Sequence, residues 1–139
     1  MVSFGTCGAL VDDLAVGAIV SVQRLYRESA LVGPVVPLDG FPPVALTSVA
    51  EPVHTAARRA ILAGLGLQVV DMEAASVRQE AGALPFFALK IVSDAAGGHE
   101  DDPIGAPTRL APARIARFLG RALKLVETRL APALLAQLA

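Results

Sequence analysis

Residues 86–94 read Phe-Phe-Ala-Leu-Lys-Ile-Val-Ser-Asp, an apolar run that ends abruptly in two polar residues. The run is almost continuously apolar and lacks the alternation of a strand with one wet face. Continuous apolar strands are typical of sheets that are covered on both faces. We therefore predict a buried strand over 86–92 that breaks at Ser93-Asp94, in a sheet with helices packed on it.

Segments of the same kind recur on both sides of this run. Strands are predicted over 1–4, 18–22, 44–49 and 67–70, helices over 51–63, 72–82 and from about 113, and irregular connections over 33–43 and 99–112. Glycines close the first two helices, because glycine readily adopts the left-handed conformation of a helix C-terminus. The alternation predicts an α/β fold with a mixed central sheet flanked by helices, as a single domain over residues 1–139.

Composition excludes several classes of protein. The chain has 139 residues, 54% apolar and 18% charged, with a net charge of −1 and a mean hydropathy of +0.57. It is too apolar for a disordered chain, and its small net charge predicts no nucleic-acid partner. No uncharged stretch approaches the roughly 20 residues of a membrane-spanning helix. One cysteine and no signal-peptide pattern predict a cytoplasmic domain.

Polar groups follow three apolar runs, at Gly5-Thr6-Cys7-Gly8, Asp71-Met72-Glu73 and Ser93-Asp94. Ligands of open α/β sheets bind beyond the carboxyl ends of the strands, so these side chains are predicted to converge on one rim. The competing interpretation is that the three acids merely cap the helices that follow them. Three such strand ends in one small chain favour a shared site.

The three segments resemble, in the same order, motifs of the nucleoside phosphorylase and MTA/SAH nucleosidase superfamily. Val2–Leu10 followed by Val16–Val20 is similar to its glycine-containing strand, Val70–Ser76 to its ribose-binding segment and Pro85–Asp94 to its base-site strand. The resemblance implies a nucleoside phosphorylase-like fold that lacks the family's N-terminal part. The motifs are most similar to the hopanoid-associated branch, thought to release adenine from an adenosyl-hopane.

Enzymes of that superfamily cleave the N-glycosidic bond of nucleosides through an oxocarbenium-like ribosyl cation. The resemblance implies that Met72 and Glu73 bind the ribose, Glu73 through strong charge-assisted hydrogen bonds. It implies that Asp94, oriented by Ser93, contacts the base and gives a proton to N7 of a purine as the catalytic acid. It implies a small-molecule nucleoside as partner, and neither a cofactor nor a metal.

The nucleophile side departs from the family pattern. Thr6 and Gly5 match positions that touch the nucleophile or phosphate, but Ser3 stands where phosphorylases tend to carry an arginine. A serine does not neutralise phosphate, so the match favours water as the nucleophile. We expect the front strand that supplies the water-activating carboxylate of nucleosidases to be missing. In the family, a segment that stacks an aromatic side chain on the base should lie shortly before Glu51. This sequence has no aromatic residue there, and the nearest is Phe41.

Three functions therefore stay open. The first is hydrolytic release of adenine from an adenosine derivative. The second is a non-catalytic remnant or nucleoside-binding module, and the third a phosphate-dependent phosphorylase that uses another cation. The apolar composition and an uncovered sheet edge predict a homo-oligomer, with a dimer favoured.

The remaining polar residues are interpreted as structural. His54 is expected on the surface of a helix, Cys7 as a small buried apolar residue, and His99–Asp102 as a solvated acidic loop rather than a metal site. A basic stripe runs beside the apolar stripe of the last helix and comprises Arg114, Arg117, Arg121 and Lys124. A solvated helix face is favoured over contact with anionic lipid.

Overall fold

The computed structural model describes residues 1–97, 111–132 and 136. The strands are β1 (Val2–Ala9), β2 (Ile19–Arg27), β3 (Ala30–Leu31), β4 (Pro43–Ser48), β5 (Val69–Asp71) and β6 (Phe87–Ala95). The helices are α1 (Ala56–Gly64), α2 (Ala74–Glu80) and α3 (Pro112–Leu125), which a π-helical turn η1 (Val126–Leu130) extends. No helix in the described residues is long and apolar enough to cross a membrane.

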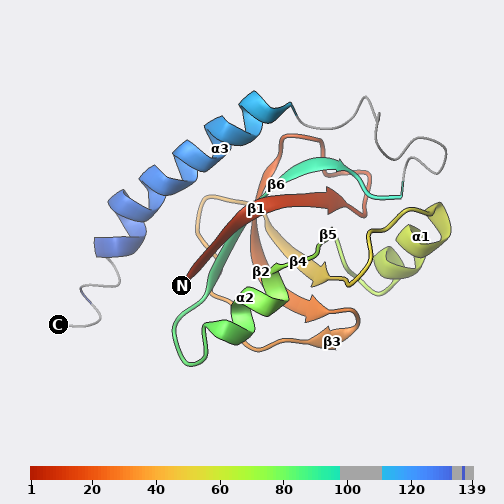
Figure 1. Cartoon of the computed structure of the whole chain (residues 1–139), viewed down its shortest axis with the longest axis horizontal. Coiled ribbons are helices and arrows are strands. Elements are labelled where there is room, and N and C mark those ends of the chain that lie inside the picture. The colour runs from red at the N-terminus through yellow and green to blue at the C-terminus, as the bar shows by residue number, and fades with distance from the viewer. Residues whose placement is uncertain (98–110, 133–135, 137–139) are drawn as a thin grey trace.

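The strands form one mixed sheet in the order β3-β2-β4-β5-β1-β6, and a further pairing of β2 with β6 closes all but β3 into a barrel (Figure 1). The β1–β6, β2–β4 and β4–β5 pairs are parallel. The β1–β5, β2–β3 and β2–β6 pairs are antiparallel. The predicted α/β fold, a mixed sheet flanked by helices, is confirmed.

Both faces of β6 are buried over its apolar run, as predicted. Along β6, Ala88 and Val92 belong to the cluster that the barrel and α2 enclose. Leu89 and Ile91, which alternate with them, pack instead against Phe118 of α3. A third cluster lies beneath α1. A strand buried on both faces has no position for a solvated side chain, which explains the unbroken apolar sequence.

Two strands continue through the residues that were predicted to end them. The parallel pairing of β1 with β6 continues past Gly5 and Gly8, and neither glycine has a positive φ. A Cβ at Gly8 would lie 2.9 Å from the Cβ of Ala96, so this glycine permits close packing rather than a turn. β6 likewise includes Ser93 and Asp94. The predicted strand breaks were wrong because polarity here marks a pocket beside the strand.

Two helices begin later than predicted. The helix predicted from residue 51 begins at Ala56, because Thr55 caps it and accepts a hydrogen bond from the backbone N of Arg58 at 3.1 Å. His54 therefore lies in the loop before α1. The helix predicted from residue 72 begins at Ala74.

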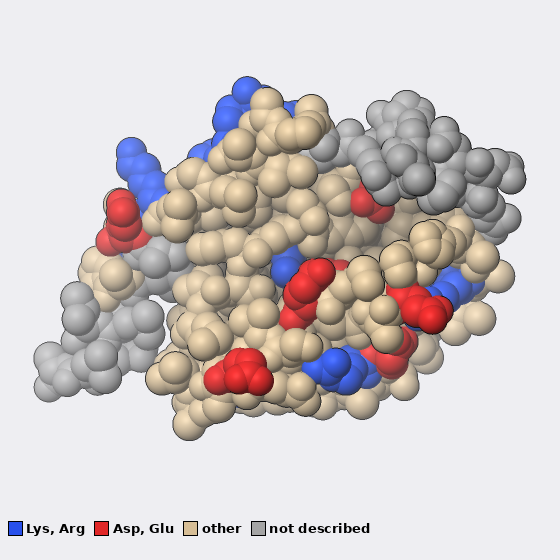
Figure 2. Space-filling view, viewed as in Figure 1, with Lys and Arg blue, Asp and Glu red and all other residues tan. Residues whose placement is uncertain are grey.

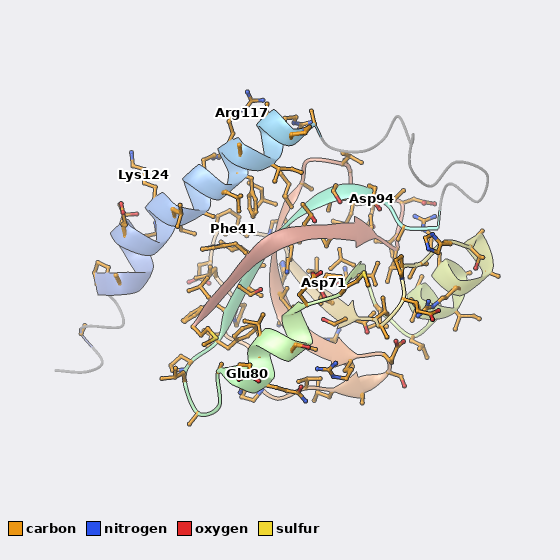
Figure 3. All side chains as sticks on the ribbon, viewed as in Figure 1. Phe41, Asp71, Glu80, Asp94, Arg117 and Lys124 are labelled. Atoms are coloured by element: carbon orange, nitrogen blue, oxygen red, sulfur yellow. The ribbon has the colours of Figure 1, made fainter. Side chains whose placement is uncertain are left out.

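Residues 33–42 form an irregular connection, as predicted, whereas residues 98–110, with His99–Asp102, lie outside the described residues. The side chains of the basic stripe are exposed along α3, on the flank beside the buried Phe118 and Ala122. Figure 2 shows blue side chains gathered over this helix, and in Figure 3 Arg117 and Lys124 point away from the sheet.

Candidate active site

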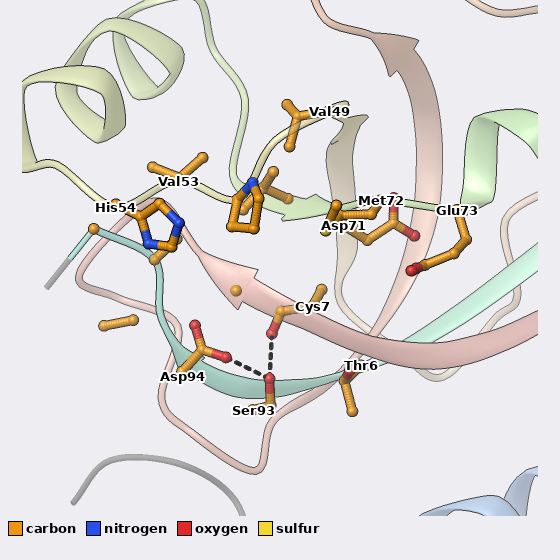
Figure 4. A pocket seen from close by; sticks show the side chains of 16 residues that line it. Thr6, Cys7, Val49, Val53, His54, Asp71, Met72, Glu73, Ser93 and Asp94 are labelled. Carbon is orange, nitrogen blue, oxygen red and sulfur yellow. Dashed lines mark hydrogen bonds between the residues drawn. The ribbon is translucent and has the colours of Figure 1, made fainter. Parts of the chain in front are cut away.

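A pocket of about 270 Å³ opens beside β1, β6 and the segment after β5 (Figure 4). Its volume is just below the range of about 300–1,000 Å³ that is typical of small-molecule sites. Its lining includes all the predicted site residues except Gly5, namely Thr6, Met72, Glu73, Ser93 and Asp94. The predicted convergence of three polar segments on one site is therefore present in the structure.

Gly5 lies beside the buried Lys90. It does not line the pocket, and a Cβ at this position would lie 3.2 Å from Nζ of Lys90. The missing side chain thus leaves room for a buried ammonium group. Of the two residues predicted on the nucleophile side, Thr6 lines the pocket and Gly5 does not, and the nucleophile-side role of both stays a prediction.

Ser93 and Asp94 lie together near the end of β6. The Ser93 hydroxyl donates a hydrogen bond to Oδ2 of Asp94 at 2.6 Å and lies 3.3 Å from the carbonyl oxygen of Cys7. The half-buried Asp94 carboxyl is thereby oriented, and its Oδ1 has no hydrogen-bond partner in the described part of the chain. The capping interpretation is wrong for Asp94, because this residue lies within a strand.

Met72 and Glu73 form the opposite group of the site, between β5 and α2. Both side chains are exposed. Glu73 occupies the N-cap position of α2, but its side chain makes no capping hydrogen bond, so the capping interpretation is wrong here as well. Figure 4 shows Glu73 and Asp94 on different sides of the pocket, with β1 passing between them. Two separate carboxyl groups therefore remain available to a ligand.

A buried ion pair lies behind Glu73. Nζ of Lys90 is 2.8 Å from Oδ2 of Asp71, and the two side chains are 2% and 1% exposed. The Asp71 carboxylate also accepts hydrogen bonds from the Ser48 hydroxyl at 2.5 Å and from the backbone N of Ala74 at 3.1 Å. For Asp71 the capping interpretation is therefore confirmed. The signal in the sequence was the lone lysine within an apolar run, since an unpaired buried charge is costly.

His54 is a lining residue that the sequence analysis placed on a helix surface. It lies in the loop between β4 and α1, where the carbonyl of its neighbour Val53 accepts a hydrogen bond from the backbone N of Gly97 at 3.0 Å. Phe41, the nearest aromatic residue before Glu51 in the sequence, packs in the cluster beneath α3 and does not line the pocket (Figure 3). Of the described lining residues, His54 alone carries an aromatic ring. Its place depends on where α1 starts, which the sequence did not reveal.

The electrostatics of the pocket are acidic. Asp71, Glu73 and Asp94 line it, and no Lys or Arg does among the described residues. Burial raises the pKa of the Cys7 thiol to about 12, with the two aspartates adding to the rise and Lys90 opposing it. The thiol is therefore protonated at neutral pH and unsuited to attack a substrate. The prediction that Cys7 is a small buried residue is confirmed.

Solved structures share this fold. The MTAN of Chlamydia trachomatis is 20% identical, with a TM-score of 0.69 over 91% of this chain and 62% of that one. The 5′-methylthioadenosine/S-adenosyl homocysteine nucleosidase (MTAN) of Helicobacter pylori is 19% identical, with a TM-score of 0.67 over 88% of this chain and 67% of that one. Other structures of the Chlamydia protein hold MTA or adenine.

Futalosine hydrolase of Helicobacter pylori is a more distant neighbour, 18% identical, with a TM-score of 0.60 over 67% of this chain and 54% of that one. No family model and no curated protein matches the sequence. The structural neighbours belong to the nucleoside phosphorylase/MTAN superfamily, so the expected resemblance is confirmed at the level of the fold. The chain spans less than two thirds of the Chlamydia structure.

Proposed function

We propose that this chain binds a purine ribonucleoside and hydrolyses its N-glycosidic bond, releasing adenine from an adenosine derivative. The observation that carries the proposal is the placement of Ser93-Asp94 and Met72-Glu73 on different sides of one pocket (Figure 4). The fold shared with two nucleosidases and a futalosine hydrolase supports it.

The proposed pose places the base beside Asp94 and the sugar beside Glu73. The Glu73 carboxylate has no hydrogen-bond partner among the described residues and is suited to accept hydrogen bonds from the two ribose hydroxyls. Met72, unbranched and polarisable, packs against the sugar face. His54 offers a flat ring at the other end of the pocket, where a purine would lie.

In the proposed reaction the bond between C1′ and N9 breaks, and its electron pair leaves with the base. Asp94 gives its proton to N7, so that the base departs as neutral adenine. The oxygen of a water molecule bonds to C1′ of the ribosyl cation, and the proton that this water loses returns to Asp94 through solvent. Glu73 places negative charge near the cation as it develops.

Water is favoured over phosphate as the nucleophile. Phosphate needs cationic partners, and the described lining holds three carboxylates and no Lys or Arg. Lys90 forms an ion pair with the lining residue Asp71 and does not itself line the pocket. A phosphorylase would need a cation that the described lining does not supply.

A calorimetric titration with adenosine and with adenine tests the proposed pose. Glu73→Gln should weaken adenosine binding by about 1.5–3 kcal/mol, the worth of hydrogen bonds to a charged group. Adenine affinity should not change, because adenine has no ribose. Glu80→Gln is the matched control, since Glu80 is an exposed acid of the same helix that does not line the pocket. Equal adenosine affinities of the wild type and Glu73→Gln would refute the ribose contact.

A further inference from the structure

A buried polar group at the wall of the pocket consists of Ser48, Asp71 and Lys90, which as whole residues are 3%, 6% and 2% exposed. Replacing a buried ion pair by apolar residues is often neutral or stabilising, so stability alone does not explain why these residues stand inside the barrel. Their hydrogen bonds reach the segment that carries Glu73.

Those bonds converge on the first turn of α2. The Asp71 carboxylate accepts from the backbone N of Ala74 at 3.1 Å, and the Ser48 oxygen accepts from the backbone N of Ala75 at 2.9 Å. The Ser48 hydroxyl proton goes to Oδ1 of Asp71 at 2.5 Å, and the backbone N of Val49 donates to the Asp71 carbonyl at 2.9 Å. The backbone is thus held on both sides of Met72 and Glu73.

We infer that Ser48, Asp71 and Lys90 are positioning residues that hold Glu73 where the ribose binds, an inference that rests on the function proposed above. Glu73 makes no capping bond of its own, so its place is set by the backbone before and after it. Lys90 fixes Oδ2 of Asp71, which leaves Oδ1 directed at Ser48.

The same ion pair connects the two sides of the pocket. Lys90 lies on β6, the strand that carries Ser93 and Asp94, whereas Asp71 ends β5 directly before Met72. A change in the separation of these strands would move the base-side acid relative to Glu73. The pair therefore holds the spacing between the groups proposed to contact base and sugar.

The test compares two neighbouring hydroxyls of β4. Ser48→Ala removes a bond to α2, whereas Thr47→Val removes an equally buried hydroxyl that donates to the carbonyl of Glu28 at 2.7 Å. We expect Ser48→Ala to weaken adenosine binding about tenfold, the effect of losing the hydrogen bonds of one fixed carboxylate. Adenine affinity should stay unchanged, and Thr47→Val should change neither affinity despite a similar loss of thermal stability.

A second comparison separates positioning from charge. Lys90→Met/Asp71→Leu and Lys90→Met/Asp71→Asn both remove the buried charges, but only the asparagine keeps an acceptor for Ser48 and Ala74. The asparagine variant should bind adenosine more tightly than the leucine variant, with equal adenine affinity. If the leucine variant does not fold, the comparison of Ser48→Ala with Thr47→Val decides alone.

Equal adenosine affinity of Ser48→Ala and Thr47→Val would overturn the positioning role. Equal affinity of the two double variants for adenosine would do the same. A wild type that binds adenosine no more tightly than adenine would overturn both the ribose contact and this inference. A wild type that prefers adenosine, with a Ser48→Ala variant that keeps the whole preference, would overturn this inference alone.

Discussion

Asp94 is the residue on which the proposed chemistry depends most. Its Oδ2 is occupied by the Ser93 hydroxyl, while Oδ1 has no partner in the described residues. A carboxyl group held in this way has one oxygen free to meet N7 of a purine. Because Asp94 lies within β6 and caps no helix in the described residues, its main alternative role is to organise the end of the strand.

Asp94→Asn distinguishes the two roles. The amide keeps the shape of the side chain and an acceptor for Ser93, but its N–H protons are too weakly acidic to be transferred to the base. Loss of general acid catalysis should lower the rate of adenine release by about 10²- to 10⁴-fold, while the melting temperature should change little. Both quantities are measured on the same sample. Wild-type release by Asp94→Asn would show that Asp94 is structural.

Single residues were predictable where a polar group interrupts an apolar pattern. Glu73 and Asp94 follow apolar runs, and both line the pocket. Lys90 carried a comparable signal, but its partner Asp71 comes from another strand, and only the closure of the barrel brings the two together. No sequence pattern identified His54 as a pocket residue, because its position in the lining depends on how the loop before α1 folds.

Elements were predicted better than their ends. Continuous apolar runs identified β4 and β6 because these strands are buried on both faces. The ends of strands depend on how the strands pair. Gly5 and Gly8 of β1 could not be distinguished from turn residues without knowing that Lys90 lies beside Gly5 and Ala96 beside Gly8. The start of α1 moved to Ala56 because Thr55 satisfies the free N–H group of the first turn.

The loop before α1 is held to the end of β6 through Gly97. Its φ is +71°, and a Cβ there would lie 2.5 Å from the carbonyl oxygen of Thr55. Gly97→Ala should lower the free energy of unfolding by more than about 1–2 kcal/mol, the cost of the left-handed conformation alone, because the loop must also shift. Chemical denaturation measures this difference.

Gly64→Ala is the matched control for that substitution. Gly64 is helical, has no positive φ, and a Cβ there would meet no atom within 4 Å. Alanine at this position should stabilise the chain by about 0.5–1 kcal/mol. A Gly97→Ala variant as stable as Gly64→Ala would mean that Gly97 does not fix the loop.

At the scale of the whole molecule, α3 packs through one face and leaves large apolar side chains exposed. Phe118 and Ala122 pack on the sheet, whereas Leu119 and Leu123 are 39% and 60% exposed. These exposed apolar side chains accord with the expected homo-oligomer, which stays a prediction. No residue of α3 is among the described residues that line the pocket.

The central claim is that the pocket cleaves a purine nucleoside with water. Reverse-phase chromatography of adenine released from several adenosine derivatives, with and without inorganic phosphate, tests it most directly. We expect adenine and a free sugar to form at the same rate in both conditions. Formation of a sugar 1-phosphate would contradict hydrolysis and establish a phosphorylase, and nucleoside binding without any release would identify a binding module.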